Sequence, residues 1–326
     1  MSGALLRVEH LSLDYRIGGR TVRALDGADL VLDEGASIGV VGESGSGKST
    51  LGSAVGRLLP RAAHLAGGGV RVAGEPVFDL APAALRRLRR ELLGFVFQDP
   101  IASLDPTMRV GRQLRLVLGR RAGDKEVAGH LERVRLDPAV ARAYPHQLSG
   151  GMAQRVAIAM AMATEPRLLV ADEPTAALDS QVREEVLNVV FGLAAEAGAG
   201  IVWLSHDLPA VARRCERVAV MYGGRVVEEG PAAEVLGRPA HPYTAALARS
   251  APAAAGPGTR LVPVPGRPPV LTGPAPGCAF APRCAFAIDR CSRERPALAR
   301  VGGQTVLCHR AGEPVLTAAR EAEVDA

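Results

Sequence analysis

The stretch Gly42-Glu-Ser-Gly-Ser-Gly-Lys-Ser-Thr50 decides the fold of this chain. It follows the apolar run 37–41 and precedes a segment with helical spacing, which is the setting in which the pattern G-x-x-x-x-G-K-[ST] binds phosphate. Its glycines let the backbone curl so that successive N–H groups point inward, and the following helix adds the positive end of its dipole. The residues expected to contact phosphate groups are Gly42, Glu43, Ser44, Gly45, Ser46, Gly47, Lys48, Ser49 and Thr50.

Lysine is rare in this sequence, and its position supports the same interpretation. Of the 39 basic residues only Lys48 and Lys125 are lysine, and all the others are arginine. A compact ammonium suits the β- and γ-phosphates of a nucleotide better than a broad guanidinium does. The hydroxyl of Ser49 can ligate Mg²⁺. A glycine-rich turn without a ligand is the alternative, and the lysine and the strand–helix setting argue against it.

Three further apolar runs end in polar residues. The runs 94–97, 168–171 and 201–204 lead into Gln98, Asp172-Glu173 and Ser205-His206. Buried parallel strands with polar groups just beyond their carboxyl ends bind ligands at that edge of an α/β sheet. We expect Asp172 to hold Mg²⁺ directly or through water, and Glu173 to act as the general base on the attacking water.

A second anion site is predicted at Leu148-Ser-Gly-Gly151, which precedes the helical run 152–164. Ser149 is a good N-cap, and the glycines allow close backbone approach. With two phosphate-binding elements in one chain, the sequence resembles the ATP-binding-cassette (ABC) ATPases over about residues 5–250. In that family two cassettes pair head to tail, and each ATP lies between the loop of one and the Leu-Ser-Gly-Gly helix of the other. The resemblance implies that Ser149, Gly150 and Gly151 contact nucleotide in this way.

The resemblance also implies roles for residues at other motif positions. Gln98 matches the glutamine that senses Mg²⁺ and water and leads toward the membrane partner. Asp179, in Ala177-Leu178-Asp179, matches the aspartate that crosses the dimer. His206 matches the histidine that contacts the γ-phosphate, and Tyr15 is the residue expected to stack on adenine. The implied catalytic residues are Glu173, His206 and Gln98, and the implied Mg²⁺ ligands are Ser49, Gln98 and Asp172.

The fold that follows is α/β. We expect a P-loop NTPase cassette with a mostly parallel RecA-like core sheet, an antiparallel β subdomain and a helical subdomain at about residues 99–165, the whole spanning residues 1–250. Residues 251–277 contain eight prolines and five glycines, a composition typical of a semi-rigid connector. A C-terminal cysteine-containing extension, residues 278–326, follows.

Four local strings narrow the resemblance to the dipeptide, oligopeptide and nickel branch of ABC importers. They are Phe97-Gln-Asp-Pro-Ile-Ala-Ser-Leu-Asp-Pro106, Tyr144-Pro-His-Gln-Leu-Ser-Gly-Gly-Met152, His241-Pro-Tyr-Thr244 and Pro276-Gly-Cys-Ala-Phe-Ala-Pro-Arg-Cys284. The branch implies an ATP hydrolase, peripheral on the cytoplasmic face of the cell membrane. It would drive two permease subunits fed by an extracellular solute-binding protein, together with a second ATPase subunit that is identical or different. Peptides are the expected solute, and nickel chelates or other small solutes are the alternative.

Composition bears on the remaining alternatives. No apolar run is long enough to span a bilayer, and the first ten residues do not resemble a secretory signal, so we expect a cytoplasmic location. The net charge of +5 is spread along the chain and aromatic residues make up only 3%, which argues against nucleic-acid binding. A soluble ABC ATPase of translation or DNA repair is the alternative class. Such proteins carry two cassettes or a long coiled coil, whereas this sequence shows one cassette and no long heptad stretch.

Cysteines cluster in the last 49 residues, at Cys278, Cys284, Cys291 and Cys308, while Cys215 lies alone and is expected to be buried. A reducing cytoplasm disfavours disulfides, so a metal is expected. The spacings lack the C-x₂₋₄-C of zinc knuckles, whereas four thiolates suit a [4Fe–4S] cluster. Tails of this type in the importer family are associated with such a cluster. Zinc or free thiols remain alternatives.

Overall fold

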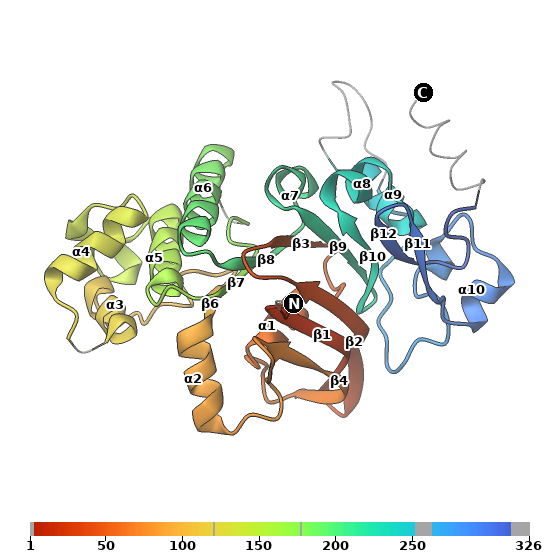
Figure 1. Cartoon of the computed structure of the whole chain (residues 1–326), viewed down its shortest axis with the longest axis horizontal. Helices are drawn as coiled ribbons and strands as arrows, with labels where there is room; N and C mark the ends of the chain where they lie inside the picture. Colours follow the sequence, from red (N-terminus) through yellow and green to blue (C-terminus); the bar gives the residue numbers. More distant parts are fainter. Residues whose placement is uncertain (1–2, 120, 177, 252–262, 314–326) are drawn as a thin grey trace. The chain divides into compact units, whose positions relative to one another are not determined.

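The computed structural model describes residues 3–119, 121–176, 178–251 and 263–313 (Figure 1). The chain divides into two compact units. Unit 1 comprises residues 1–5, 32–36 and 79–203, and unit 2 comprises residues 6–31, 37–78 and 204–326. Each unit therefore gathers segments that are far apart in the sequence.

Unit 2 contains an antiparallel sheet built from the first part of the chain. Its strands lie in the order β2-β1-β4-β5, with bounds β1 (Leu6–Ile17), β2 (Arg20–Leu32), β4 (Ala63–Val72) and β5 (Glu75–Pro76). In β1, Leu6 is buried and Arg7 exposed, which begins the alternation of a strand with one face on the core. Gly18 and Gly19 adopt φ of 56° and 77°, as a two-residue hairpin turn requires. The predicted antiparallel β subdomain is confirmed.

A second set of strands in unit 2 carries the predicted phosphate-binding loop. Strand β3 (Ser37–Val41) is parallel to β9 (Arg217–Tyr222), which is antiparallel to β10 (Arg225–Pro231). Strand β10 pairs with β12 (Gln304–Leu307), and β12 pairs with β11 (Leu298–Val301) (Figure 1). The helical elements described in this unit are α1 (Lys48–Val55), α7 (Leu208–Arg214), α8 (Ala232–Gly237), α9 (Pro242–Ser250), η4 (Ala281–Arg283) and α10 (Asp289–Arg293). The C-terminal segment thus extends this set by two strands.

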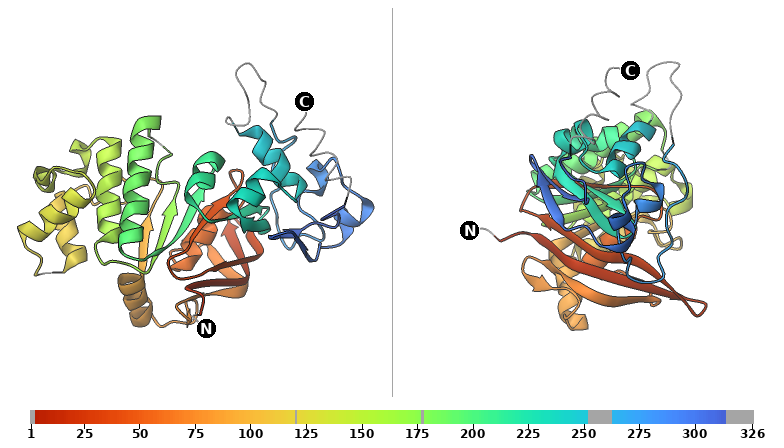
Figure 2. Two further views of the ribbon diagram at one scale, coloured as in Figure 1. Left: turned by 45° about the horizontal axis from the view of Figure 1, so that its top comes forward. Right: turned by 90° about the vertical axis from the view of Figure 1, so that its right-hand side faces the viewer.

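Unit 1 combines parallel strands with a group of helices. Strands β6 (Leu93–Val96) and β7 (Leu168–Asp172) are parallel, and β8 (Gly200–Ser205), most of which belongs to this unit, lies beside β7. The helical elements are α2 (Pro82–Leu92), α3 (Val110–Leu118), α4 (Asp124–Arg133), η1 (Pro138–Arg142), η2 (Pro145–Gln147), α5 (Gly150–Met162) and α6 (Ser180–Glu196). Helix α5 packs against α3, α4 and α6 (Figure 2). The expected helical subdomain is present in this group.

All four apolar runs predicted to be strands are strands, namely β3, β6, β7 and β8. Every residue of β8 is buried, including Trp203 at 1% exposure, as expected for a strand covered on both faces. Burying a large apolar side chain such as this one contributes about 1.5–3 kcal/mol. Burial of these strands therefore fixes the backbone at their carboxyl ends, where the polar residues follow.

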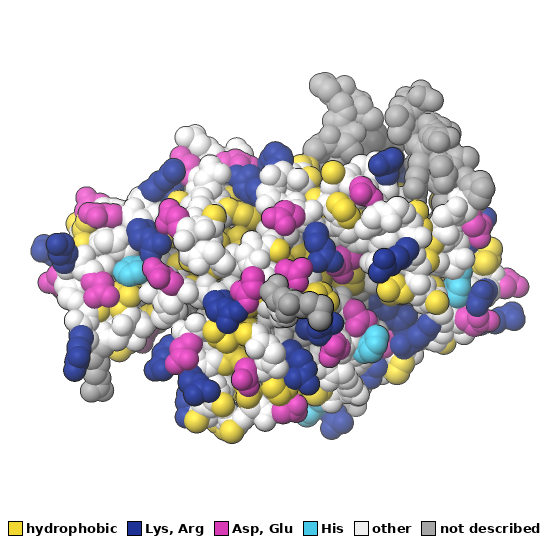
Figure 3. All heavy atoms as spheres, viewed as in Figure 1, with side chains coloured by type: hydrophobic (Ala, Val, Ile, Leu, Met, Phe, Trp, Pro, Cys, Tyr) yellow, Lys and Arg dark blue, Asp and Glu magenta, His cyan; other side chains and the backbone are white. Residues whose placement is uncertain are grey.

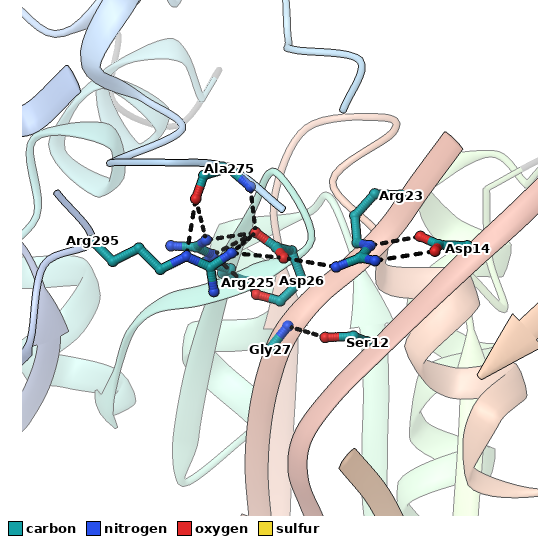
Figure 4. A network of polar contacts seen from close by, with 8 residues as sticks. All are labelled: Ser12, Asp14, Arg23, Asp26, Gly27, Arg225, Ala275 and Arg295. Atoms are coloured by element: carbon teal, nitrogen blue, oxygen red, sulfur yellow. Dashed lines mark hydrogen bonds and ion pairs between the residues drawn. The ribbon is translucent and has the colours of Figure 1, made fainter. Parts of the chain in front are cut away.

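The C-terminal segment is anchored to unit 2 around Asp26 of β2 (Figure 4). The Asp26 carboxylate is 1% exposed and accepts hydrogen bonds from Arg225, from the Ala275 N–H at 3.1 Å and from Arg295 at 3.1 Å. Burial raises the pKa of Asp26, but the hydrogen bonds from Arg225 and Ala275, together with the charges of Arg225 and Arg295, outweigh burial and lower the pKa. A buried carboxylate with this many donors stays ionised, so the segment is fixed by charge as well as by strand pairing.

The predicted boundaries at residues 250 and 277 stay predictions. Residues 252–262 of the predicted connector and 314–326 of the predicted extension lie outside the described residues. Residues 263–277 are described and contain neither helix nor strand, in keeping with their proline and glycine content.

Charged side chains are mixed on the surface drawn in Figure 3, where Lys and Arg alternate with Asp and Glu over much of the face in view. Within the described ranges, no helix has the length and apolar character needed to cross a bilayer.

Candidate nucleotide-binding site

The phosphate-binding loop, residues 42–50, connects β3 to α1 in unit 2. Gly42 and Gly47 have φ of 153° and 106°. A Cβ on Gly42 would lie 2.3 Å from the carbonyl oxygen of Met221, and one on Gly47 would lie 2.7 Å from that of Ala24. Only glycine fits both the space and the backbone conformation at these positions, so the loop curls as the motif predicts.

Lys48 begins α1 and is 6% exposed. Its Nζ donates hydrogen bonds to the carbonyl oxygens of Gly42 at 2.7 Å and Glu43 at 3.1 Å, so the ammonium lies within the loop. The buried Oγ of Ser46 has no hydrogen-bond partner among the described residues, and Ser49 is exposed at the first turn of the helix. A curled backbone, a buried ammonium and an unpaired hydroxyl together fit the phosphates of a nucleotide.

Tyr15 of β1 lies beside this loop. Its hydroxyl is 3.3 Å from Oγ1 of Thr50, and either group can donate the hydrogen bond. The structure therefore brings Tyr15 to the helix that follows the loop. Its stacking on adenine stays a prediction.

Glu43, the second residue of the loop, has partners that sequence reasoning did not identify. Its backbone N–H donates to the Tyr243 hydroxyl at 2.8 Å. Its carboxylate accepts hydrogen bonds from both terminal nitrogens of Arg283, at 2.7 and 3.1 Å, and this pairing raises the pKa of the guanidinium. Tyr243 and Arg283 belong to two of the strings that indicated the importer branch, but nothing in those strings indicated contact with the loop.

A buried aromatic cluster surrounds these partners. The ring centroids of Tyr222, Tyr243 and Phe280 lie 4.4 to 5.3 Å apart. Burial raises the pKa of both tyrosines, so their hydroxyls stay neutral. His241 caps α9 by accepting the Tyr243 N–H at Nδ1, at 3.0 Å, and burial lowers its pKa to about 4. The cluster thus supplies neutral aromatic and imidazole groups around the Glu43–Arg283 ion pair.

In unit 1, two of the predicted catalytic residues, Gln98 and Glu173, follow neighbouring strand ends. Val96 of β6 pairs with Ala171 of β7, so Gln98 and Glu173 each stand two residues beyond paired positions of parallel strands. Gln98 is exposed, while Asp172 and Glu173 are half-buried. Glu173 has φ of 43°, a left-handed conformation that costs a non-glycine residue about 1–3 kcal/mol and is enriched at functional sites.

The predicted second anion site lies at the start of α5, also in unit 1. Ser149 is the N-cap, as predicted, and its Oγ accepts the Met152 N–H at 3.3 Å. Gly151 packs closely on α6, because a Cβ there would lie 2.8 Å from Val182. Asp179 caps α6 by accepting the N–H groups of Gln181 and Val182. Ala177 of the predicted dimer-crossing loop lies outside the described residues.

His206 follows β8 and is exposed. The next residue, Asp207, donates its N–H to Ser205 Oγ at 3.0 Å and caps α7, which fixes the backbone on both sides of the histidine. The predicted residues therefore divide between the units. Unit 2 holds the loop, Tyr15 and His206, and unit 1 holds Gln98, Ser149, Gly150, Gly151, Asp172, Glu173 and Asp179.

Oxygen donors are available for the predicted Mg²⁺. The Ser49 hydroxyl, the Asp172 carboxylate and the Gln98 amide oxygen are hard ligands of the kind that Mg²⁺ prefers. Their assignment as ligands stays a prediction.

The predicted [4Fe–4S] cluster is not supported. Across the described ranges, no group of three or more His, Cys, Asp or Glu side chains is arranged to hold a metal ion. The four tail cysteines nevertheless influence one another. Burial raises the pKa of the Cys308 thiol to about 11 against a hydrogen bond from the Arg310 backbone that lowers it, and the neighbouring thiols of Cys278, Cys284 and Cys291 add smaller increases. Cys215 is buried just beyond α7, as expected.

Comparison with known proteins identifies the family. Residues 25–176 match the family model described as ABC transporter, and residues 227–291 match that of the oligopeptide/dipeptide transporter C-terminal region. A Brucella abortus (strain 2308) protein bearing the name of a peptide import ATP-binding protein is 40% identical over 312 residues, which cover 93% of this chain and 94% of that protein. The oligopeptide transport ATP-binding protein OppD of Mycobacterium tuberculosis is 42% identical over 304 residues, which cover 90% of this chain and 50% of that protein.

Solved structures of ABC cassettes are similar to this chain. The ATP-binding cassette MJ0796, in a dimeric post-hydrolysis state bound to ADP and phosphate, has a TM-score of 0.63 and 33% identity, covering 70% of this chain and 98% of that chain. The cbiO1 protein of Clostridium perfringens, part of the ABC transporter complex cbiONQ, has a TM-score of 0.61 and 29% identity, covering 72% and 91%. This chain therefore belongs to the ABC transporter ATPase family. Its C-terminal match is to the oligopeptide/dipeptide transporter members of that family.

Proposed function

We propose that this chain is the ATP-hydrolysing subunit that energises an ABC importer of peptides. The main support is that two features occur in one chain: a phosphate-binding loop with a buried lysine, and a match to the oligopeptide/dipeptide transporter C-terminal region. The first feature belongs to nucleotide chemistry, and the second is a feature of peptide transporters. Relatives named for peptide import and oligopeptide transport point to the same class of solute.

ATP binding in this proposal begins at the loop. The backbone N–H groups and Lys48 hold the phosphates, and Tyr15 stacks on adenine. When bound, Mg²⁺ neutralises charge that develops on the phosphate oxygens. Ser49, Gln98 and Asp172 would hold it through oxygen atoms.

Hydrolysis requires a water placed in line with the γ-phosphate. Glu173 accepts a proton from that water, and its left-handed backbone, next to the end of β7, restricts where the carboxylate can point. His206 contacts the γ-phosphate. Ser149, Gly150 and Gly151 act on the nucleotide held by a second ATPase subunit, because a helix start that is exposed offers its N–H groups to a ligand from outside.

The assembly around this subunit follows from the family. A second ATPase subunit, identical or different, completes each nucleotide site. Two permease subunits form the path through the membrane, and an extracellular solute-binding protein delivers the peptide. The chain is then peripheral on the cytoplasmic face.

Reconstitution of the complete transporter in proteoliposomes tests this function. We expect peptide-loaded binding protein, added at the extracellular side, to raise ATP hydrolysis several-fold and to drive uptake of labelled peptide. The same preparation with a nickel chelate is the matched control for solute class. Stimulation by the chelate and not by any peptide would reassign the solute, and ATP hydrolysis without association with permeases would contradict the transport role.

We further propose that Cys278, Cys284, Cys291 and Cys308 bind a [4Fe–4S] cluster. Support comes from the number of thiols and from their grouping within residues 278–308, and not from a ready-made metal geometry. Anaerobic purification followed by iron, sulfide and zinc assays tests this. Four irons and four sulfides per chain are expected, and they should be lost when Cys284 and Cys291 are replaced by serine. A colourless protein without iron, or one with a single zinc, would refute the cluster.

A further inference from the structure

A carboxylate in the phosphate-binding loop is an electrostatic problem. Glu43 is the second residue of the loop, and its side chain is 24% exposed. ATP carries several negative charges, and a nearby unpaired carboxylate would repel it through a partly buried medium in which charge is weakly screened. The loop therefore needs something that cancels the charge of Glu43.

Arg283 supplies that charge from the C-terminal segment. Its terminal nitrogens bind both oxygens of the Glu43 carboxylate, at 2.7 and 3.1 Å. This two-point geometry pairs the planar guanidinium with the planar carboxylate and turns Glu43 toward the C-terminal segment.

The remaining donors of Arg283 are also used. They reach the hydroxyl of Tyr222 at 3.1 Å, the carbonyl oxygen of Val264 at 3.2 Å and the carbonyl oxygen of Pro265. The side chain is 5% exposed and lies over the rings of Tyr222 and Phe280, at 5.6 and 5.9 Å from their centroids. Arginine alone offers five donors in one plane, so this position is built for it.

The segment that carries Arg283 has a fixed place in unit 2. Its Ala275 and Arg295 bind the buried Asp26, and its strand β12 pairs with β10 (Figures 1 and 4). The backbone of Glu43 is held in turn by the Tyr243 hydroxyl. Side chain and backbone of one loop residue are thus both fixed from parts of the chain 200 or more positions away.

We propose that Arg283 is a positioning residue of the nucleotide site. It cancels the charge of Glu43 and holds that side chain aside, so the C-terminal segment is part of the machinery that binds ATP. The proposal rests on ATP binding by this chain. Arg283 acts through Glu43 and does not touch the nucleotide.

Binding of a fluorescent ATP analogue to the full chain, with the KM and kcat of the reconstituted transporter, tests the proposal. Arg283→Met should raise the dissociation constant and the KM about tenfold, with a smaller effect on kcat, since one partly screened charge near a polyanion is worth about 1.4 kcal/mol. Arg283→Lys keeps the charge and should recover most of the affinity. In the double variant Glu43→Gln with Arg283→Met the affinity should return toward wild type, because neither charge remains.

A purely structural role predicts a different pattern. Arg283→Lys would then be as harmful as Arg283→Met, and Glu43→Gln would not relieve the loss. Arg290→Gln is the matched control, since Arg290 lies in the same segment, is 60% exposed and pairs only with Glu294 among the contacts described. If Arg283→Met does not fold, Arg283→Lys still decides, because it keeps the charge but loses the two-point geometry.

Two results overturn the inference: unchanged affinity in a folded Arg283→Met protein, or no relief in the double variant. Absence of ATP binding by the wild-type chain would instead contradict the proposed function.

Discussion

Two helix starts in this molecule are candidate anion sites, and they differ in how many supporting contacts surround them. The loop before α1 is enclosed: Lys48 is buried within it, Glu43 is tied to Tyr243 and Arg283, and the Gly224 N–H donates to the Ser46 carbonyl at 3.0 Å. The start of α5 is open, because Ser149 and Gly150 are exposed. We infer that the first can hold a phosphate through groups of this chain, whereas the second acts on a nucleotide held by a second subunit.

The strongest test of this comparison removes the general base. Glu173→Gln keeps the shape of the side chain but cannot accept the proton, so kcat should fall about a thousandfold. ATP binding should survive. A stable dimer should accumulate with Mg-ATP, because the start of α5 in one subunit stays bound to the unhydrolysed nucleotide of the other. Rapid-quench kinetics and light scattering measure both effects. Retained hydrolysis would remove Glu173 from the role of base.

The enclosed loop is tested by its lysine. Lys48→Ala should weaken ATP binding about a hundredfold, since hydrogen bonds from a buried charged group are worth about 1.5–3 kcal/mol. Lys125→Ala is the matched control, because the exposed Lys125 is the only other lysine in the sequence. Equilibrium binding of labelled ATP to both variants checks this. Equal affinities for the two would show that the loop does not depend on the ammonium.

The open helix start is tested by a charge. Ser149→Asp retains an N-cap acceptor but places a negative charge where a phosphate is expected, so hydrolysis by the assembled transporter should fall at least about tenfold. Ser149→Asn retains a cap without charge and should be milder. Binding of ATP to the isolated chain should change far less than hydrolysis does. If hydrolysis by the full assembly is untouched, this helix is not part of the nucleotide site.

A last prediction concerns the pH dependence of stability, through His241 beside Phe280 of the aromatic cluster. Buried His241 has a pKa of about 4, below its ordinary 6.5, so the unfolded chain takes up a proton first as pH falls. The free energy of unfolding should therefore decline from pH 6.5 to 4, by about 3 kcal/mol at most for this group, and then level off. His241→Asn preserves the cap on α9 without titrating and should flatten that part of the curve. Urea unfolding of both proteins across this range measures it, and parallel curves would exclude His241.

Much of the fold was predictable because local patterns carry it. The apolar runs that form β3, β6, β7 and β8 are bounded by glycines and polar residues. The start of α5 was predictable because Ser149, a good N-cap, precedes two glycines and an apolar run. The loop glycines were predicted for the same reason, since their φ values follow from a motif with one backbone solution.

The supports of the loop were not predictable in this way. Glu43 meets Arg283 across 240 positions, and Asp26 meets Arg295 across 269. Pairing over such distances leaves no local pattern, and in a chain whose basic residues are almost all arginine no single arginine stands out. The tail was expected to be a tethered appendage with a cysteine centre, whereas its arginines and backbone make the described contacts with unit 2.

The hairpin of β11 and β12 has a consequence for protein handling. Without this hairpin, β10 would be an edge strand with unpaired N–H and C=O groups, which can pair with strands of other molecules. Among the described residues, the hairpin covers that edge and leaves the four-residue β11 at the edge of the sheet, with Arg300 and the exposed Leu298 in it. Truncated forms of the protein that end after α9 should therefore aggregate, even though they retain the whole phosphate-binding loop.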